Sequence, residues 1–141
     1  MRRNRVEVLL HFVWTTIERA PLISEEMERS LYRCIHAKCA DLKCEVLAVG
    51  GMPDHVHLAI ALPTTLEIWK VMHGVKGVSS AFVRDQLMKP GEVFGWRDGY
   101  GVFSFSRSHK RAVIEYIRNQ KTHHASGDLW PHAEEPDEVD G

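Results

Sequence analysis

Residues 44–62 read CEVLAVGGMPDHVHLAIAL, two strand-like runs separated by a cluster of turn formers. The runs at 44–50 and 55–62 are apolar and contain β-branched side chains, which favours strands. The linking residues 50–54, Gly-Gly-Met-Pro-Asp, are types that tight turns prefer. The stretch therefore predicts an antiparallel hairpin in the middle of the chain.

The segments on either side of this hairpin alternate between strand and helix periodicities. Strands are predicted at 5–16 and 101–107, and helices at 24–40, 65–88 and 109–124. Ser24 and Ser108 stand where N-caps are expected. The order β-α-β-β-α-β-α is that of the split βαβ, ferredoxin-like pattern, followed by one further helix. We therefore expect an α+β fold, a four-stranded antiparallel sheet with helices on one face and the other face open for a site.

Composition bounds the class of protein. The 141 residues are 44% hydrophobic and 26% charged, which is typical of one compact domain. We expect one domain over residues 1–130 and a disordered acidic tail over 131–141. No run reaches the ~18 apolar residues of a membrane span, and the start lacks a signal-peptide pattern, which predicts a cytoplasmic protein. The spacing of the three cysteines fits neither a disulfide framework nor a CxxC site, so reduced, mostly buried thiols are expected.

Basic residues are concentrated in the second half of the chain. Residues 70–121 hold ten Lys and Arg against four Asp and Glu. Such an excess permits a polyanionic partner such as nucleic acid, although a solvated surface explains it as well. The chain has no GxxxxGK[ST], GxGxxG or GxSxG motif, so nucleotide and serine-hydrolase chemistry have no support.

The sharpest local feature is the pair His55 and His57 in the predicted strand 55–62. Side chains two residues apart on a strand share a face, so both imidazoles lie on one side while Val56 and Leu58 point into the core with Ile60. Two neutral imidazoles can share one divalent cation. Two surface or hydrogen-bonded histidines remain the alternative at this point.

A second feature lies on the last predicted helix. Tyr116 and Gln120 are four residues apart and project from the same helical face. Tyrosine can act as a covalent nucleophile when a neighbour activates its phenol, whose free pKa is about 10. A packed tyrosine beside an exposed amide is the alternative. His11 has no partner at ligand spacing, and a metal role for His123 and His124 is disfavoured because adjacent residues diverge on a helix.

Five segments in order resemble the single-tyrosine HUH transposases of bacterial insertion sequences and their relatives, the REP-associated tyrosine transposases. They are FVWTT (12–16), MPDHVHL (52–58), VKGVSS (75–80), GYGVFSFS (99–106) and YIRNQKTHH (116–124). Each motif is loose by itself, and the ordered set is specific.

The resemblance implies roles for particular residues. It implies metal ligation by His55, His57 and Gln120, with Mg²⁺ or Mn²⁺ as the metal, and Tyr116 as the nucleophile that forms a 5′-phosphotyrosine link to DNA. It also implies a substrate of single-stranded DNA with a short hairpin, a homodimer, and no nucleotide cofactor. Charge and place suggest DNA contacts at five basic residues, which are Lys76, Arg107, Lys110, Arg111 and Arg118.

Other functions remain open from the sequence. A domesticated, non-catalytic protein that binds single-stranded DNA or hairpins would keep the fold. A replication initiator or relaxase shares the chemistry but is usually larger. An RNA-binding ferredoxin-like module would use exposed aromatics, for which Phe103 and Phe105 are the only candidates. The acidic ending also differs from a basic tail that grips DNA.

Overall fold

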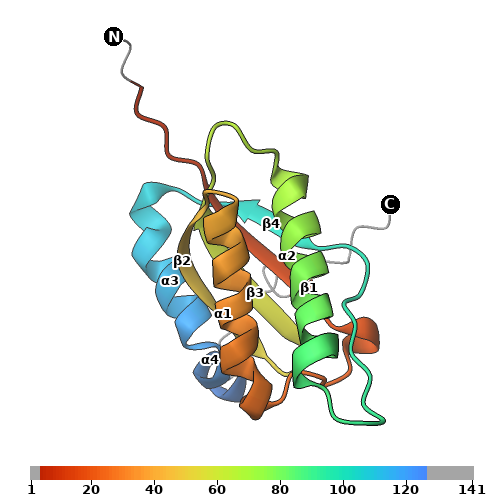
Figure 1. Cartoon of the computed structure of the whole chain (residues 1–141). Coiled ribbons are helices and arrows are strands. Elements are labelled where there is room, and N and C mark those ends of the chain that lie inside the picture. The colour runs from red at the N-terminus through yellow and green to blue at the C-terminus, as the bar shows by residue number, and fades with distance from the viewer. Residues whose placement is uncertain (1–3, 127–141) are drawn as a thin grey trace.

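The structure is a computed structural model that describes residues 4–126 (Figure 1). The predicted acidic tail, 131–141, lies outside the described residues. In chain order the elements are β1 (Leu9–Thr15), η1 (Ile17–Arg19), α1 (Glu25–Asp41), β2 (Glu45–Met52), β3 (His55–Ala61), α2 (Ile68–Phe82), η2 (Val83–Leu87), β4 (Gly101–Ser104), η3 (Arg107–His109), α3 (Lys110–Arg118) and α4 (Gln120–Ser126).

The four strands form one antiparallel sheet in the order β2-β3-β1-β4. The hairpin predicted from residues 44–62 is the β2–β3 pair, and its turn brings Met52 opposite His55. β1 lies between β3 and β4, with Leu9 opposite Ala61 and Thr15 opposite His55. The predicted α+β, ferredoxin-like arrangement is confirmed.

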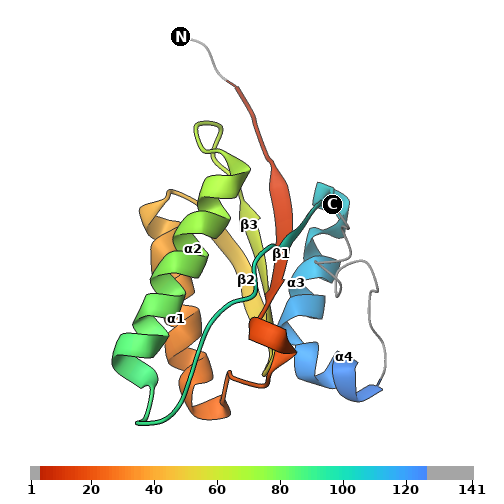
Figure 2. The ribbon, with the colours of Figure 1, turned by 90° about the vertical axis from the view of Figure 1, so that its right-hand side faces the viewer.

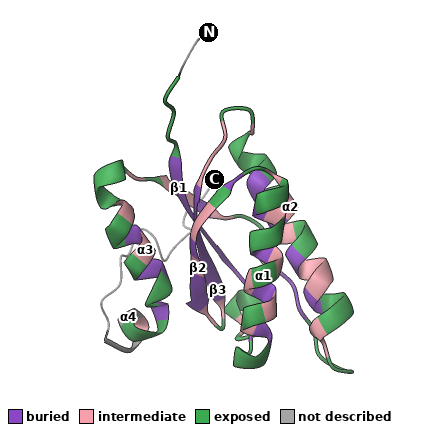
Figure 3. Cartoon of the chain, turned by 60° about the vertical axis from the view of Figure 1, so that its left-hand side comes forward, coloured by how far each residue is buried: buried purple, intermediate pink, exposed green. Residues whose placement is uncertain are grey.

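The main core lies between the sheet and helices α1 and α2, which cover one face together (Figures 1 and 2). Val56, Leu58 and Ile60 of β3 are fully buried there, as their alternation predicted. Phe12 and Trp14 of β1 join the same cluster. Burying each large apolar side chain stabilises the fold by roughly 1.5–3 kcal/mol, so this face carries most of the hydrophobic stabilisation. Figure 3 shows the resulting pattern, with buried strands and helices exposed on their outer sides.

The second face of the sheet is covered, whereas the sequence predicted an open face. Helix α3 packs across it (Figure 2) through a small cluster of Ala48, Ala59, Val113, Tyr116 and Ile117. The side chains of the two alanines are small, so the backbone of α3 can approach the sheet closely. Gly50 has the same effect, since a Cβ atom at this position would collide with the carbonyl oxygen of Ile117. The tyrosine-bearing helix is therefore itself the cover of this face.

Several element boundaries differ from the sequence prediction. The first strand begins at Leu9, and the second helix ends at Phe82 before a π-helical turn. The last helix is divided at Asn119, whose φ of −104° and ψ of 29° end α3 before α4 begins. Ser24 caps α1 as predicted, accepting a hydrogen bond from the Met27 amide, whereas Ser108 lies inside η3.

Two further expectations concern membranes and thiols. Over residues 4–126, none of the helices combines the length and the apolar character needed to cross a bilayer. Cys39 and Cys44 are buried and Cys34 is half-buried, and all three are free thiols. The expectation of reduced, mostly buried cysteines is confirmed.

Candidate active site

His55 and His57 lie side by side on the face of β3 that α3 covers. Their ring centroids are 5.0 Å apart and the rings are nearly perpendicular. Both are buried, at 1% and 0% exposure. The spacing of two residues on a strand accounts for this arrangement, and the shared face predicted from the sequence is confirmed.

The ring of His55 is oriented by the carboxylate of Asp54, in the β2–β3 turn. Asp54 Oδ1 lies 2.7 Å from His55 Nδ1. This hydrogen bond lowers the pKa of Asp54 below its ordinary value more than burial raises it, and the charges of His55 and of the nearby Arg19 guanidinium add smaller decreases. An ionised carboxylate can only accept, so His55 donates from Nδ1 and a neutral ring has its lone pair on Nε2.

The ring of His57 is held by His11, a histidine without a partner at ligand spacing in the sequence. His11, on β1, places its Nε2 atom 2.8 Å from His57 Nδ1, and the two ring centroids are 5.0 Å apart. His11 is 3% exposed. Its partner is 46 positions away in the sequence, so ligand spacing along the chain could not reveal the pair. The one sequence feature that pointed to His11 is the alternation of β1, which places this polar side chain on the same face as Leu9 and Val13.

Tyr116 and Gln120 reach the two histidines from α3 and α4. The ring of Tyr116 stands perpendicular to that of His57, with centroids 5.8 Å apart. The Gln120 side chain donates from Nε2 to the Tyr116 carbonyl at 3.2 Å, and its Oε1 atom faces His55 Nε2 at 3.3 Å. Four residues singled out from the sequence therefore meet in one place, although they belong to three elements.

His124 also lies at this site. Its Nε2 atom is 3.2 Å from Gln120 Oε1, and its ring centroid is 5.0 Å from that of His55. The sequence predicted no metal role here, because the adjacent His123 and His124 diverge on a helix. One turn of α4 nevertheless brings His124 beside Gln120, which is a signal that i, i+4 spacing could have provided.

The donor set fits a divalent cation. With Nδ1 of each ring engaged by Asp54 or His11, the Nε2 atoms are the ones that can coordinate. Among the described residues, no group of three or more His, Cys, Asp or Glu side chains is arranged to hold a metal by itself, which leaves room for a donor of another type beside the two imidazoles. The Gln120 amide oxygen is such a donor. Two imidazoles and an amide oxygen suit Mn²⁺ or Mg²⁺, and imidazole favours Mn²⁺.

The five basic residues proposed as DNA contacts do not share one surface. Arg107, Lys110, Arg111 and Arg118 belong to η3 and α3, on the same side of the sheet as Tyr116. Lys76 belongs to α2 on the opposite side, and its Nζ donates to the carbonyl oxygens of Arg97 and Gly99 at 2.7 and 2.9 Å. Lys76 thus ties the segment before β4 to α2.

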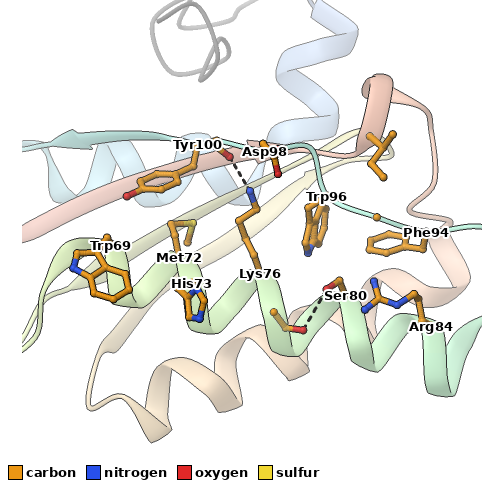
Figure 4. Close-up of a pocket in the computed structure, with 14 residues that line it drawn as sticks. Trp69, Met72, His73, Lys76, Ser80, Arg84, Phe94, Trp96, Asp98 and Tyr100 are labelled. Atoms are coloured by element: carbon orange, nitrogen blue, oxygen red, sulfur yellow. Dashed lines mark hydrogen bonds between the residues drawn. The ribbon is translucent and has the colours of Figure 1, made fainter. Parts of the chain in front are cut away.

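An open groove of about 670 Å³ lies beside Lys76, between α2 and residues 94–100 (Figure 4). Trp96 forms part of its wall and donates from its indole to Ser79 Oγ at 3.0 Å. Trp69, at the other end, is 53% exposed, whereas Trp14 is fully buried. The groove is on the α2 side of the sheet, so it is separate from the cluster around Tyr116.

Comparisons with known proteins identify a family and support the fold. The family model described as an IS200-like transposase matches residues 4–120. The ISDra2 transposase TnpA of Deinococcus radiodurans is 25% identical over 115 residues, which span 78% of this chain and 81% of that protein. The crystal structure of a candidate transposase from Deinococcus radiodurans R1 matches with a TM-score of 0.65 at 27% identity, over 85% of this chain and 98% of that one. A REP-associated tyrosine transposase bound to a REP hairpin matches in fold, with a TM-score of 0.65 at 16% identity, over 88% and 73% of the two chains.

Proposed function

Because the chain belongs to the IS200-like transposase family, we propose that it cuts and rejoins single-stranded DNA at hairpin-marked ends, with Tyr116 as the nucleophile. The family resemblance read from the sequence is confirmed by the same match. The observation that carries the proposal is the meeting of Tyr116 with His55, His57 and Gln120, since a nucleophile and three metal donors are what this reaction requires.

The reaction is a transesterification at phosphorus. The phenol oxygen of Tyr116 attacks a DNA phosphate, a new bond forms between that oxygen and phosphorus, and the bond to the 3′ oxygen breaks. The phenol loses one proton and the departing 3′ oxygen gains one. The products are a 5′-phosphotyrosine and a free 3′-hydroxyl. A 3′-hydroxyl from another strand can reverse the attack, so joining needs no nucleotide cofactor.

The side chains around Tyr116 have positioning roles in this step. Val113 and Ile117 anchor α3 on the sheet and so direct the phenol toward the face that carries His57. His55, His57 and Gln120 would hold Mg²⁺ or Mn²⁺, which neutralises phosphate charge and polarises the phosphoryl oxygen. Asp54 keeps His55 in the tautomer that can coordinate. Positioning and electrostatics are the two contributions that such a site supplies.

The substrate in this proposal is single-stranded DNA with a short hairpin, bound by a homodimer. Arg107, Lys110, Arg111 and Arg118 support it, because they lie on the elements that carry or adjoin Tyr116. Their contacts with phosphates would make affinity fall with salt. The REP-associated transposase named above, which was solved with a hairpin, supports the choice of DNA probe.

The burial of the site favours a second candidate, a non-catalytic protein that binds single-stranded DNA or hairpins. Tyr116 is 2% exposed, and His55, His57 and Gln120 are 1% exposed or less. A phosphate reaches the phenol only when the cover of these side chains moves. A protein that never opens would bind DNA and leave it intact.

A covalent-adduct assay separates the two candidates. The protein is incubated with Mn²⁺ and single-stranded DNA that carries a hairpin and a label at its 3′ end, which stays with the fragment bound to tyrosine, and the products are run on a denaturing gel. Transposase chemistry gives a slowly migrating protein–DNA band that is absent in Tyr116→Phe and weak in His57→Ala. Tyr100→Phe is the matched control, since Tyr100 lines the groove on the α2 side and its loss leaves the band in place. Tight DNA binding without any adduct would support the second candidate.

A further inference from the structure

We propose that His11 is a positioning residue that holds His57 in the tautomer able to bind a divalent cation. The inference rests on the metal site of the proposed function. It is carried by the hydrogen bond of 2.8 Å between His11 Nε2 and His57 Nδ1, which is buried from solvent at both ends. His11 acts through His57 and has no part in the attack on DNA.

The position of β1 gives His11 a fixed orientation. β1 is an inner strand that is buried along its whole length. His11 is opposite Ala59 of β3 on one side and opposite Phe103 of β4 on the other. Its ring meets that of Phe103 edge to face, with centroids 6.5 Å apart. Because both neighbouring strands hold the His11 imidazole in place, its Nε2 atom already faces His57 before a metal binds. No conformational entropy of the His11 side chain then has to be lost on binding.

A single proton between the two rings decides whether His57 can coordinate. If His57 donates from Nδ1, its Nε2 atom carries the lone pair that a metal needs. If His11 donates from Nε2, His57 carries its proton on Nε2 and cannot bind. Metal binding therefore requires His11 to accept the hydrogen bond and to keep its own proton on Nδ1.

The two histidines on β3 have acceptors of different charge. Asp54 fixes His55 through a carboxylate oxygen, whereas His11 fixes His57 through an imidazole nitrogen. A neutral acceptor orients the ring without adding negative charge below the place where a DNA phosphate must approach. The position is also suited to an apolar residue, since Leu9 and Val13 occupy the same face of β1. Packing by itself does not call for a histidine there.

Two substitutions separate orientation from packing. His11→Gln retains an acceptor oxygen in reach of His57 Nδ1, and His11→Leu retains the bulk without any acceptor. Mn²⁺ binding is measured without DNA, from the electron paramagnetic resonance signal of free Mn²⁺. We expect about 10- to 100-fold weaker binding for His11→Leu, the usual effect of losing an outer-shell partner, and a clearly smaller loss for His11→Gln. His36→Leu, an exposed histidine on α1, is the control and binds as the parent does.

A second readout needs neither metal nor DNA. Long-range ¹H–¹⁵N correlations of the imidazoles in the metal-free parent protein report which nitrogen of His57 is protonated. Protonation at Nδ1 supports the inference, and protonation at Nε2 overturns it even if the His11 variants fail to fold. Mn²⁺ binding by His11→Leu equal to the parent's also overturns it. A parent protein that binds Mn²⁺ with the expected tautomer but forms no DNA adduct would instead refute the proposed reaction and leave the role of His11 standing.

Discussion

Asp54 and His55 are adjacent in the chain and also joined through their side chains, by a hydrogen bond of 2.7 Å from His55 Nδ1 to Asp54 Oδ1. Adjacent residues on a regular strand point to opposite faces. Asp54 is an exception because it belongs to the turn that precedes β3. In this turn Gly51 lies so close to the His55 carbonyl oxygen that a Cβ atom on Gly51 would collide with it. The turn therefore supplies the acceptor that orients the first histidine of β3.

Removing the charge of Asp54 should weaken metal binding. In Asp54→Asn the side chain can present either its oxygen or its amide group to His55, so the tautomer is no longer imposed. We expect Mn²⁺ affinity to fall about tenfold, measured by titration calorimetry. Asp41→Asn, at the exposed end of α1, is the control. Equal affinities in the two variants would show that the Asp54–His55 bond has no role in ligation.

Gly50 should be required for the position of Tyr116. A Cβ atom in Gly50→Ala would collide with the Ile117 carbonyl oxygen, so α3 must shift on the sheet. We expect adduct formation to fall by 100-fold or so, since misplacement by ~1 Å is that costly to catalysis. The assay is the rate of covalent adduct formation on the labelled hairpin substrate.

Gly77→Ala is the matched control for Gly50→Ala. A Cβ atom on Gly77, within α2, has no neighbour inside 4 Å. This change should stabilise the protein by about 0.5–1 kcal/mol, the advantage of Ala over Gly inside a helix, with adduct formation unchanged. Equal adduct rates for the two variants would contradict the positioning role of Gly50.

Lys76 should contribute more to stability than to DNA affinity. Its ammonium group donates to the carbonyl oxygens of Arg97 and Gly99. Lys76→Met should lower the free energy of unfolding by about 2 kcal/mol in urea titrations, at the typical net value of about 1 kcal/mol for each of the two hydrogen bonds. Lys110→Met should leave stability within about 0.5 kcal/mol and weaken DNA binding at low salt. If Lys76→Met instead weakened DNA binding and left stability unchanged, Lys76 would be a DNA contact as the sequence predicted.

Alkaline pH should destabilise the fold through Cys39. Burial raises the pKa of this thiol from 9.0 to about 12. Between these values the unfolded chain loses the proton while the folded chain keeps it, so stability falls as pH rises above 9. The slope for one such group is about 1.4 kcal/mol per pH unit. Urea unfolding from pH 8 to 11 should show this decline, and Cys39→Ala should show a shallower one; identical slopes would contradict the assignment.

Local patterns predicted a large part of the fold because they act over a few residues. The apolar alternation of β3 determined that Val56 faces the core and that His55 shares a face with His57. Ser24 was recognisable as an N-cap, and the turn formers after β2 identified the hairpin. The largest error concerned the second face of the sheet. Ala48, Ala59 and Gly50 allow α3 to pack there, and no local pattern shows that three small residues will meet one helix.

The site was predictable to the extent that its residues lie close together in the sequence. The pair on β3 is two residues apart, and Tyr116 and Gln120 are one helical turn apart, so each pair was visible as a pattern. No local pattern predicted a role for His11 or His124, since the partner of His11 comes from another strand and that of His124 depends on how the last helix is divided. Lys76 was grouped by charge with the basic residues of α3, although the sheet separates them.

By itself, the sequence determined the order of elements, the same-face histidines and the tyrosine–glutamine pair, since these depend on backbone periodicity within a single strand or helix. Only the tertiary structure decided that α3 covers the second face and that His11 meets His57 across the β1–β3 register. It also decided that Lys76 lies on the other side of the sheet from Arg118. Contacts between distant segments depend on packing and strand register, and periodicity carries no information about either.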